Sequence, residues 1–166
     1  FLSAKPLLAV LNVGEDRLAD PAEAFGVSAG EVEVAPVVVG AQLEEELAQL
    51  ADDEREAFLA DYGLERPARD RVIRASFELL GLQSFLTVGE DEVRAWPIRR
   101  GATALKAAGT IHSDLERGFI RAEVIGYEDF LKAGSMAAAR DSGVLRVEGK
   151  DYEVRDGEIM HVRFNV

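Results

Sequence analysis

Two apolar runs near the start of the chain predict buried strands. Residues 6–13 (PLLAVLNV) are apolar until their polar end, and residues 32–39 (VEVAPVVV) form a β-branched run that Pro36 interrupts. Continuous apolar runs of this length are typical of strands covered on both faces, as in a parallel sheet. Between the runs, Asp20-Pro21 combines a capping residue with a proline, so we expect a short helix over 20–25.

The following residues change to a helical pattern. Apolar positions between 43 and 62 lie on one face amid many acidic residues, and a second amphipathic segment over 71–80 ends at Gly81. Strand, helix, strand and helix in this order indicate an α/β layer. Two strands are too few for a complete α/β domain, so we expect the end of one.

The second half of the chain has a different pattern. Short β-type segments occur at 85–88, 93–98, 119–125, 152–154 and 159–166, and short helices are expected over 127–130 and 134–142. Asp156-Gly157 separates the last two segments and predicts a tight hairpin between them. This half therefore reads as a compact α+β domain with a mixed sheet.

Composition narrows the class of protein. The chain has 166 residues, is 48% hydrophobic and carries a formal charge of −12, so overall charge favours neither a nucleic-acid nor a membrane surface. It contains no cysteine, which excludes disulfides and thiolate chemistry and fits a reducing cytoplasm. Its apolar runs are too short to span a bilayer. Because it opens at Phe1, we expect it to begin inside a longer reading frame.

No phosphate-binding loop is visible. The only Gly-Lys pair, Gly149-Lys150, is followed by Asp151, where a hydroxyl residue would be needed to hold magnesium. We therefore expect this chain by itself neither to bind a nucleoside triphosphate tightly nor to hydrolyse it, and we assign no catalytic residue.

The end of the first strand offers a candidate binding site. Asn12 and Glu15 follow a strand expected to be parallel, and ligands of open α/β sheets bind at the carboxyl ends of such strands. An amide and a carboxylate can both hydrogen-bond the edge of a base. The alternative is a polar turn, since an Asn-x-x-Glu match is common by chance.

Other polar residues suggest weaker candidates. His112 and His161 could share a metal with Asp114 or Glu116, and Asp114, Glu116 and Glu123 could supply acid–base carboxylates. The chain has 31 acidic residues, so such clusters arise freely on a solvated surface. We predict no metal site.

Basic residues gather between 93 and 121, against the overall charge. They could contact RNA phosphates or an acidic protein surface, or could form ordinary ion pairs with nearby carboxylates, and the sequence leaves both readings open. The residues are Arg94, Arg99, Arg100, Lys106, Arg117 and Arg121.

Longer motifs in the second half carry a family resemblance. The segments EVRAW at 92–96, AAGTIHSD at 107–114 and ERGFIRAEVI at 116–125, with the ending FNV at 164–166, resemble the C-terminal region of the YchF subfamily of Obg-like P-loop NTPases. The resemblance implies that 83–166 is a TGS domain, a β-grasp, ubiquitin-like module. It implies a connecting helix over 66–82 and the end of a P-loop nucleotide-binding domain over 1–65.

The same resemblance covers the candidate site. Residues 5–15 (KPLLAVLNVGE) are similar to the strand that carries the family's Asn-x-x-Glu base-recognition motif. By this resemblance Asn12 and Glu15 read the base, with Val13 beside them, and the backbone of Gly40 and Ala41 flanks the purine.

The resemblance also implies a function for the whole protein. It would bind and hydrolyse ATP or GTP with Mg²⁺ and associate with the ribosome, with no membrane or DNA partner expected. The phosphate loop would lie before Phe1, so this chain would keep the base motif and the TGS domain. The competing hypothesis is a stand-alone TGS-type module that binds protein or RNA and has no nucleotide role.

Overall fold

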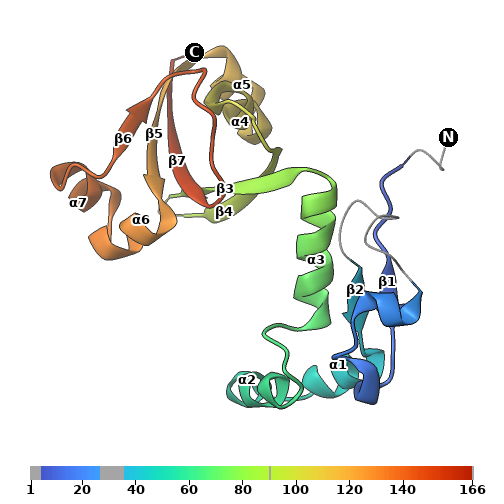
Figure 1. The fold of residues 1–166 in the computed structure, drawn as a ribbon. Helices are drawn as coiled ribbons and strands as arrows, with labels where there is room; N and C mark the ends of the chain where they lie inside the picture. Colours follow the sequence, from blue (N-terminus) through green and yellow to red (C-terminus); the bar gives the residue numbers. More distant parts are fainter. Residues whose placement is uncertain (1–4, 27–35, 90, 166) are drawn as a thin grey trace. The chain divides into compact units, whose positions relative to one another are not determined.

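The computed structural model describes residues 5–26, 36–89 and 91–165. The chain divides into two compact units, Phe1–Leu80 and Gly81–Val166 (Figure 1). The first unit contains β1 (Val10–Asn12), the 3₁₀ turns η2 (Glu15–Arg17) and η3 (Ala22–Phe25), β2 (Val37–Val39), α1 (Ala41–Leu47), α2 (Asp52–Asp61) and α3 (Ala68–Leu79).

The two strands of the first unit pair in parallel, as the apolar runs predict. Leu11 lies opposite Val38 and Asn12 opposite Val39. Both strands are shorter than the runs that predict them, and Pro36 directly precedes β2. The portion of the second run at 32–35 lies outside the described residues. The helix expected over 20–25 is the 3₁₀ turn η3.

The expectation of one helix over 43–62 is wrong, because the chain breaks there into α1 and α2. Leu47 and Leu59 pack into one core cluster with Leu18, whereas in a continuous helix they would lie about 18 Å apart along the axis. At the break, the carboxylate of Glu54 accepts a hydrogen bond of 3.3 Å from the backbone N–H of Ala51.

Side-chain hydrogen bonds hold α3 within the first unit. Glu44 of α1 accepts a 2.7 Å bond from the N–H of Ala68, which begins α3. Arg71 donates through Nη1 to the carbonyl of Val38 on β2, also at 2.7 Å. Its Nε and Nη2 atoms are buried without a partner among the described residues. Helix α3 lies in the range where a connecting helix was expected.

The second unit is built on one five-stranded sheet. The sheet has the order β4-β3-β7-β5-β6, in which β3 and β7 run parallel and the other neighbours antiparallel, so the predicted mixed sheet is confirmed. Its elements are β3 (Leu82–Val88), β4 (Val93–Arg99), α4 (Ala104–Ile111), α5 (Ser113–Arg117), β5 (Phe119–Gly126), α6 (Tyr127–Ala133), α7 (Met136–Asp141), β6 (Arg146–Glu148) and β7 (Glu158–Phe164).

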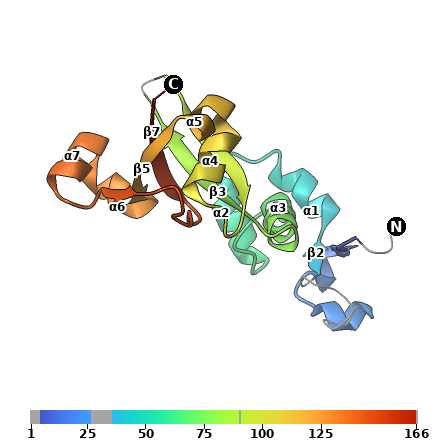
Figure 2. The same ribbon diagram turned by 90° about the horizontal axis from the view of Figure 1, so that it is seen from above.

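Helices cover both faces of this sheet. Val124 and Met160 pack with alanines of α4 in the larger core cluster, while their neighbours Ile125 and Ile159 pack with Ala139 and other residues of α6 and α7 in a smaller one. Successive strand residues point to opposite faces, so the two clusters lie on opposite sides of the sheet. Figure 2 shows α4 and α5 on the other side of the strands from α6 and α7.

The expected hairpin at Asp156-Gly157 is wrong, although the turn itself forms and Gly157 has a φ of 73°. Strand β7 lies between β3 and β5, so both of its edges are occupied and residues 152–154 cannot pair with it. Instead Glu153 makes an isolated bridge to Thr103. The sequence patterns also missed β6, α4 and α5, although Thr103 caps α4 as helix-start residues do.

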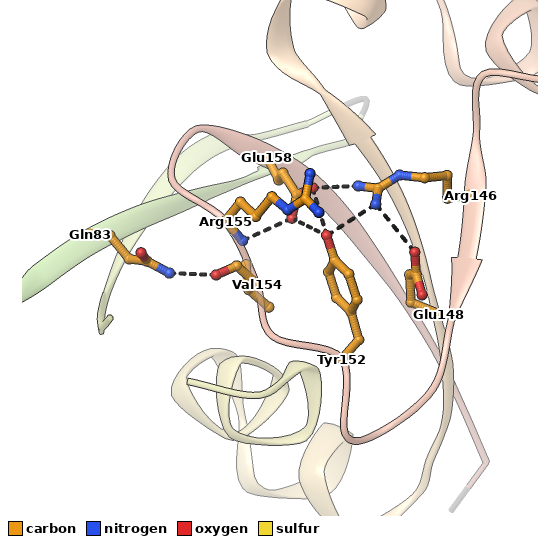
Figure 3. Close-up of polar contacts among 7 residues, drawn as sticks. All are labelled: Gln83, Arg146, Glu148, Tyr152, Val154, Arg155 and Glu158. Carbon is orange, nitrogen blue, oxygen red and sulfur yellow. Dashed lines mark hydrogen bonds and ion pairs between the residues drawn. The ribbon is translucent and has the colours of Figure 1, made fainter. Parts of the chain in front are cut away.

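A buried carboxylate, Glu158, ties the loop at 149–157 to the sheet (Figure 3). The hydroxyl of Tyr152 donates to it at 2.8 Å, the N–H of Arg155 donates at 2.9 Å, and the guanidinium of Arg146 forms an ion pair with it. Nearby, the amide of Gln83 donates to the carbonyl of Val154. These contacts replace the strand pairing that the loop lacks.

No helix in the described ranges is long and apolar enough to cross a membrane.

Candidate functional site

The candidate site lies where β1 and β2 end side by side. Because the strands are parallel, their carboxyl ends meet at one edge, and the N–H of Val13 donates to the carbonyl of Val39 at 2.8 Å. The polar residues that follow β1 therefore lie next to Gly40 and Ala41, which follow β2. This is the edge at which open α/β sheets bind ligands.

Asn12 fastens the two loops together. Its Oδ1 accepts a hydrogen bond of 3.0 Å from the backbone N–H of Ala41, the first residue of α1. The side-chain NH₂ group donates to none of the described residues, so it remains available to an acceptor on a ligand. The structure thus brings together two of the sequence-predicted residues that lie 29 positions apart.

Gly40 is buried at the start of α1 for a steric reason. A Cβ atom placed on it would lie 3.2 Å from Cδ2 of Leu18 and 3.5 Å from Cβ of Leu43. A side chain here would therefore require Leu18, a member of the core cluster below the pocket, to shift by a few tenths of an ångström. Because this Cβ would point toward the core, glycine at this position is explained by packing, and the residue also lines the pocket.

Glu15 has a partner that the sequence did not reveal. The hydroxyl of Tyr62, at the end of α2, donates to Oε2 of Glu15 at 3.1 Å. This hydrogen bond raises the pKa of Tyr62 above its ordinary value. Tyr62 lies 47 positions from Glu15, and no local pattern signals such a contact.

These residues surround an open pocket of about 660 Å³. Two of its lining residues are acidic, Glu15 and Asp16, and none is basic. Such a pocket repels phosphate but suits a group that presents N–H donors, as the edge of a purine does. The lining residues are Asn12, Val13, Gly14, Glu15, Asp16, Gly40, Gln42 and Leu43.

The cations predicted as one patch lie on several elements of the second unit. The guanidinium of Arg94 on β4 stacks 4.1 Å from the centre of the Trp96 ring, and Arg99 lies on the same strand. Arg100 follows β4 and donates to the carbonyl of Leu82. Arg121 lies on β5.

The other two members belong to the helices that cover the larger core cluster. Lys106 of α4 pairs with Glu116 at 2.8 Å, and Arg117 of α5 pairs with Asp114. These two cations therefore form ion pairs with nearby carboxylates, as the second of the two hypotheses for the patch predicts.

The histidines and carboxylates considered for a metal are separated. Nδ1 of His112 accepts from the N–H of Asp114 and caps α5, while His161 lies on β7 opposite Glu123. Among the described residues, no group of three histidine or acidic side chains could hold a metal ion.

The fold defines an α+β chain of two units, the second with a mixed five-stranded sheet. A family model described as "YchF-GTPase_C: Protein of unknown function (DUF933)" matches residues 82–165, which is this second unit almost in full. The chain belongs to the YchF family and corresponds to the C-terminal part of its members.

Relatives and a solved structure agree with this assignment. The ribosome-binding ATPase YchF of Bacillus subtilis (strain 168) is 48% identical over 173 residues, covering 100% of this chain and 47% of that protein. The protein of the same name from Pasteurella multocida (strain Pm70) is 51% identical over 168 residues, covering 100% and 46%. The structure of the Schizosaccharomyces pombe YchF GTPase matches with a TM-score of 0.81 and 28% identity over 98% of this chain and 44% of that one. The chain spans about half the length of the curated relatives that it matches.

Proposed function

We propose that this chain supplies the base-recognition edge and the TGS domain of a YchF-type nucleotide hydrolase. In this proposal residues 1–65 form the end of the P-loop domain and residues 83–166 form a β-grasp TGS domain. Residues 66–82 form the helix that connects them. The whole protein binds and hydrolyses ATP or GTP with Mg²⁺ and associates with the ribosome in the cytoplasm. The names of the relatives, which describe ribosome-binding ATPases and a GTPase, support this proposal.

The observation that carries the nucleotide role is the tie between Asn12 and Ala41 beside the acidic pocket. The amide of Asn12 and the carboxylates of Glu15 and Asp16 offer a donor and acceptors to a base, and Gly40 lines the same pocket. The phosphates and Mg²⁺ would need residues of another kind, since most nucleotide affinity comes from a cradle of backbone N–H groups and a lysine. This chain alone should therefore bind neither ATP nor GTP measurably.

Calorimetric titration of ATP and GTP into the whole protein tests this function. We expect Asn12→Ala to weaken binding roughly tenfold or more, because it removes a base contact and releases the loop at Ala41. Glu15→Ala should weaken it as well. Glu45→Ala, an exposed position on α1, is the matched control and should leave affinity unchanged.

The competing function is a binding module without a nucleotide role. The self-contained core of the second unit favours it, because that unit has its own sheet and two covered faces. If neither nucleotide binds the whole protein, or if both pocket variants bind like the wild type, the base-reading assignment is wrong. The competing function, a binding module without a nucleotide role, is then the one supported.

A further inference from the structure

One face of the sheet in the second unit carries more arginines than carboxylates, and we call this surface the arginine face. It consists of Arg121 and Glu123 of β5, His161 and Arg163 of β7, and Arg140 of α7. Arg121 lies opposite Arg163 in the strand register, and Glu123 lies opposite His161. Side chains alternate along a strand, so these residues share the face on which Ile125 and Ile159 pack against α6 and α7.

Glu123 organises two of the arginines. It is buried, and its carboxylate accepts hydrogen bonds of 3.1 Å from Nη2 of Arg140 and from Nη2 of Arg163. Burial would raise the pKa of Glu123, but the two guanidinium groups outweigh it and lower the pKa, so the carboxylate is ionised at neutral pH. One negative charge thus holds two positive ones. The arginine side chains are 53% and 47% exposed, which leaves further N–H donors open to solvent.

Arg121 adds a third cation without a counter-charge. It makes no ion pair or hydrogen bond with any residue in the described part of the chain, and its side chain is exposed. Like charges directly opposite each other on antiparallel strands destabilise a sheet. The pairing of Arg121 with Arg163 is therefore a cost to the fold that a bound anion would relieve.

A hollow of about 510 Å³ adjoins these cations. Its walls include the apolar side chains of Val88, Phe130 and Met136, and Arg140, His161 and Arg163 lie at the same hollow. This volume falls within the usual range for small-ligand pockets, about 300–1,000 Å³. A flat apolar group would therefore find an aromatic and apolar wall next to the guanidinium groups.

We propose that the arginine face binds single-stranded RNA, with backbone phosphates on Arg121, Arg140 and Arg163 and one base in the hollow beside Phe130. Arginine is suited to this role because its planar fork binds phosphate oxygens in pairs. A splayed nucleotide fits both parts of the surface, since it carries one anionic phosphate and one flat base, and such bases stack on aromatic side chains. An acidic peptide without aromatic residues would use the cations but not the apolar wall around Phe130.

The choice of RNA rests on the proposed function, in which the whole protein associates with the ribosome. The overall charge of −12 repels RNA at long range but does not exclude binding, because contacts with fixed guanidinium groups act within a Debye length of about 10 Å at moderate salt. The face differs from the patch predicted over 93–121, with which it shares only Arg121.

Fluorescence anisotropy of a labelled single-stranded RNA of about ten nucleotides, titrated with this chain, tests the proposal. We expect Arg121→Gln to weaken binding about fivefold and to reduce the slope of log affinity against log salt by about 0.7. Because Arg121 is exposed and makes no hydrogen bond or ion pair with a described residue, this variant should fold normally. Arg117→Gln removes the same charge from α5, on the other side of the sheet, and should change affinity by less than about twofold.

A second variant tests the hollow. Phe130→Leu keeps an apolar side chain in the smaller core cluster but removes the ring, so it should weaken binding about threefold while leaving the salt slope unchanged. Absence of RNA binding, equal weakening by Arg121→Gln and Arg117→Gln, or displacement of the RNA by an equal concentration of a polyglutamate peptide would each overturn the proposal.

Co-sedimentation of the whole protein with ribosomes separates this inference from the proposed function. If the wild type sediments with ribosomes and Arg121→Gln does so equally well, the arginine face is not the contact although the function stands. If this chain binds RNA as expected but the whole protein binds no nucleotide, the face stands and the nucleotide function fails.

Discussion

Asn165 passes directly over Gly118, and the approach leaves no room for a side chain. A Cβ atom on Gly118 would lie 2.3 Å from the carbonyl oxygen of Asn165 and 2.9 Å from its carbonyl carbon. The N–H of Asn165 donates to the carbonyl of Gly118 at 2.9 Å, so the two backbones are held in this position. The residue after α5 thus anchors the chain that leaves β7.

Gly118→Ala should therefore destabilise the second unit by about 2 kcal/mol, because backbone atoms rather than a flexible side chain occupy the space. The matched control is Gly149→Ala, where a Cβ would meet nothing within 4 Å. Its effect should stay within about 0.5 kcal/mol. Urea unfolding followed by the fluorescence of Trp96 measures both, and equal midpoints for the two variants would contradict the expectation.

Tyr62→Phe should affect the nucleotide pocket more than the fold. The lost hydroxyl positions Glu15, and an exposed hydrogen bond of this kind contributes little to stability. In the whole protein we expect ATP and GTP to bind roughly threefold more weakly, with an unchanged melting temperature. Tyr127→Phe, at the exposed start of α6, is the control. Wild-type affinity in Tyr62→Phe would show that Glu15 does not need this partner.

Glu158→Gln should destabilise the second unit by about 2 kcal/mol. The buried carboxylate has three donors, from Arg146, Tyr152 and Arg155, and an amide cannot match all of them. Glu148→Gln removes a carboxylate that also pairs with Arg146 but is more exposed, and it should cost less than about 1 kcal/mol. Thermal unfolding compares the two, and an equal loss would mean that the loop at 149–157 is not held by Glu158.

The stability of the second unit should fall as the pH drops below about 6.5. Burial and the charges of Arg163 and Arg140 lower the pKa of His161, against the opposing pull of Glu123. The unfolded chain therefore takes up this proton first, so the contribution is present above the ordinary value of 6.5 and is lost as the pH falls through the folded-state pKa. His161→Gln should flatten the dependence between about pH 7.5 and 5.5 in urea unfolding. If the pH dependence of stability is unchanged in this variant, a group other than His161 is responsible for it.

Protonation of Glu123 should cause a second loss of stability at lower pH. Its pKa is lowered from 4.5, so its stabilising pairs with Arg140 and Arg163 are complete above that value and are lost as the pH falls through the folded-state pKa. The same unfolding experiment extended to about pH 3.5 should show a steeper fall for the wild type than for Glu123→Gln. The variant itself should be less stable at neutral pH, since two arginines lose their shared carboxylate.

The sequence predicts those features that depend on residues close together in the chain or on the position where a strand ends. The apolar runs indicate parallel strands, and from this the meeting of Asn12 with the loop at Gly40 follows, because parallel strands end at one edge. Helix α3 is likewise indicated by its own periodicity and by Gly81, which follows it. These features need no knowledge of distant partners.

Contacts between distant segments escaped prediction. Arg163 lies 40 positions from Glu123, and Tyr62 lies 47 from Glu15, so spacing gives no hint of either pair. The hairpin failed for the same reason: Asp156-Gly157 makes its turn, but β3 and β5 already occupy the edges of β7. A turn-forming dipeptide predicts a turn but not which strands pair, because strand pairing depends on the packing of the whole unit.

The central position of β7 has a consequence for how the second unit is made. Synthesis on the ribosome proceeds from the N-terminal end, so residues 81–157 emerge before the strand that joins β3 to β5 exists. Until Glu158–Phe164 leaves the exit tunnel, the hairpin of β3 and β4 and the pair of β5 and β6 have no shared edge. The unit must therefore complete its sheet late, by insertion of its last strand between two waiting halves, and a nascent chain stalled before Glu158 would expose both halves to the cell's chaperones and proteases.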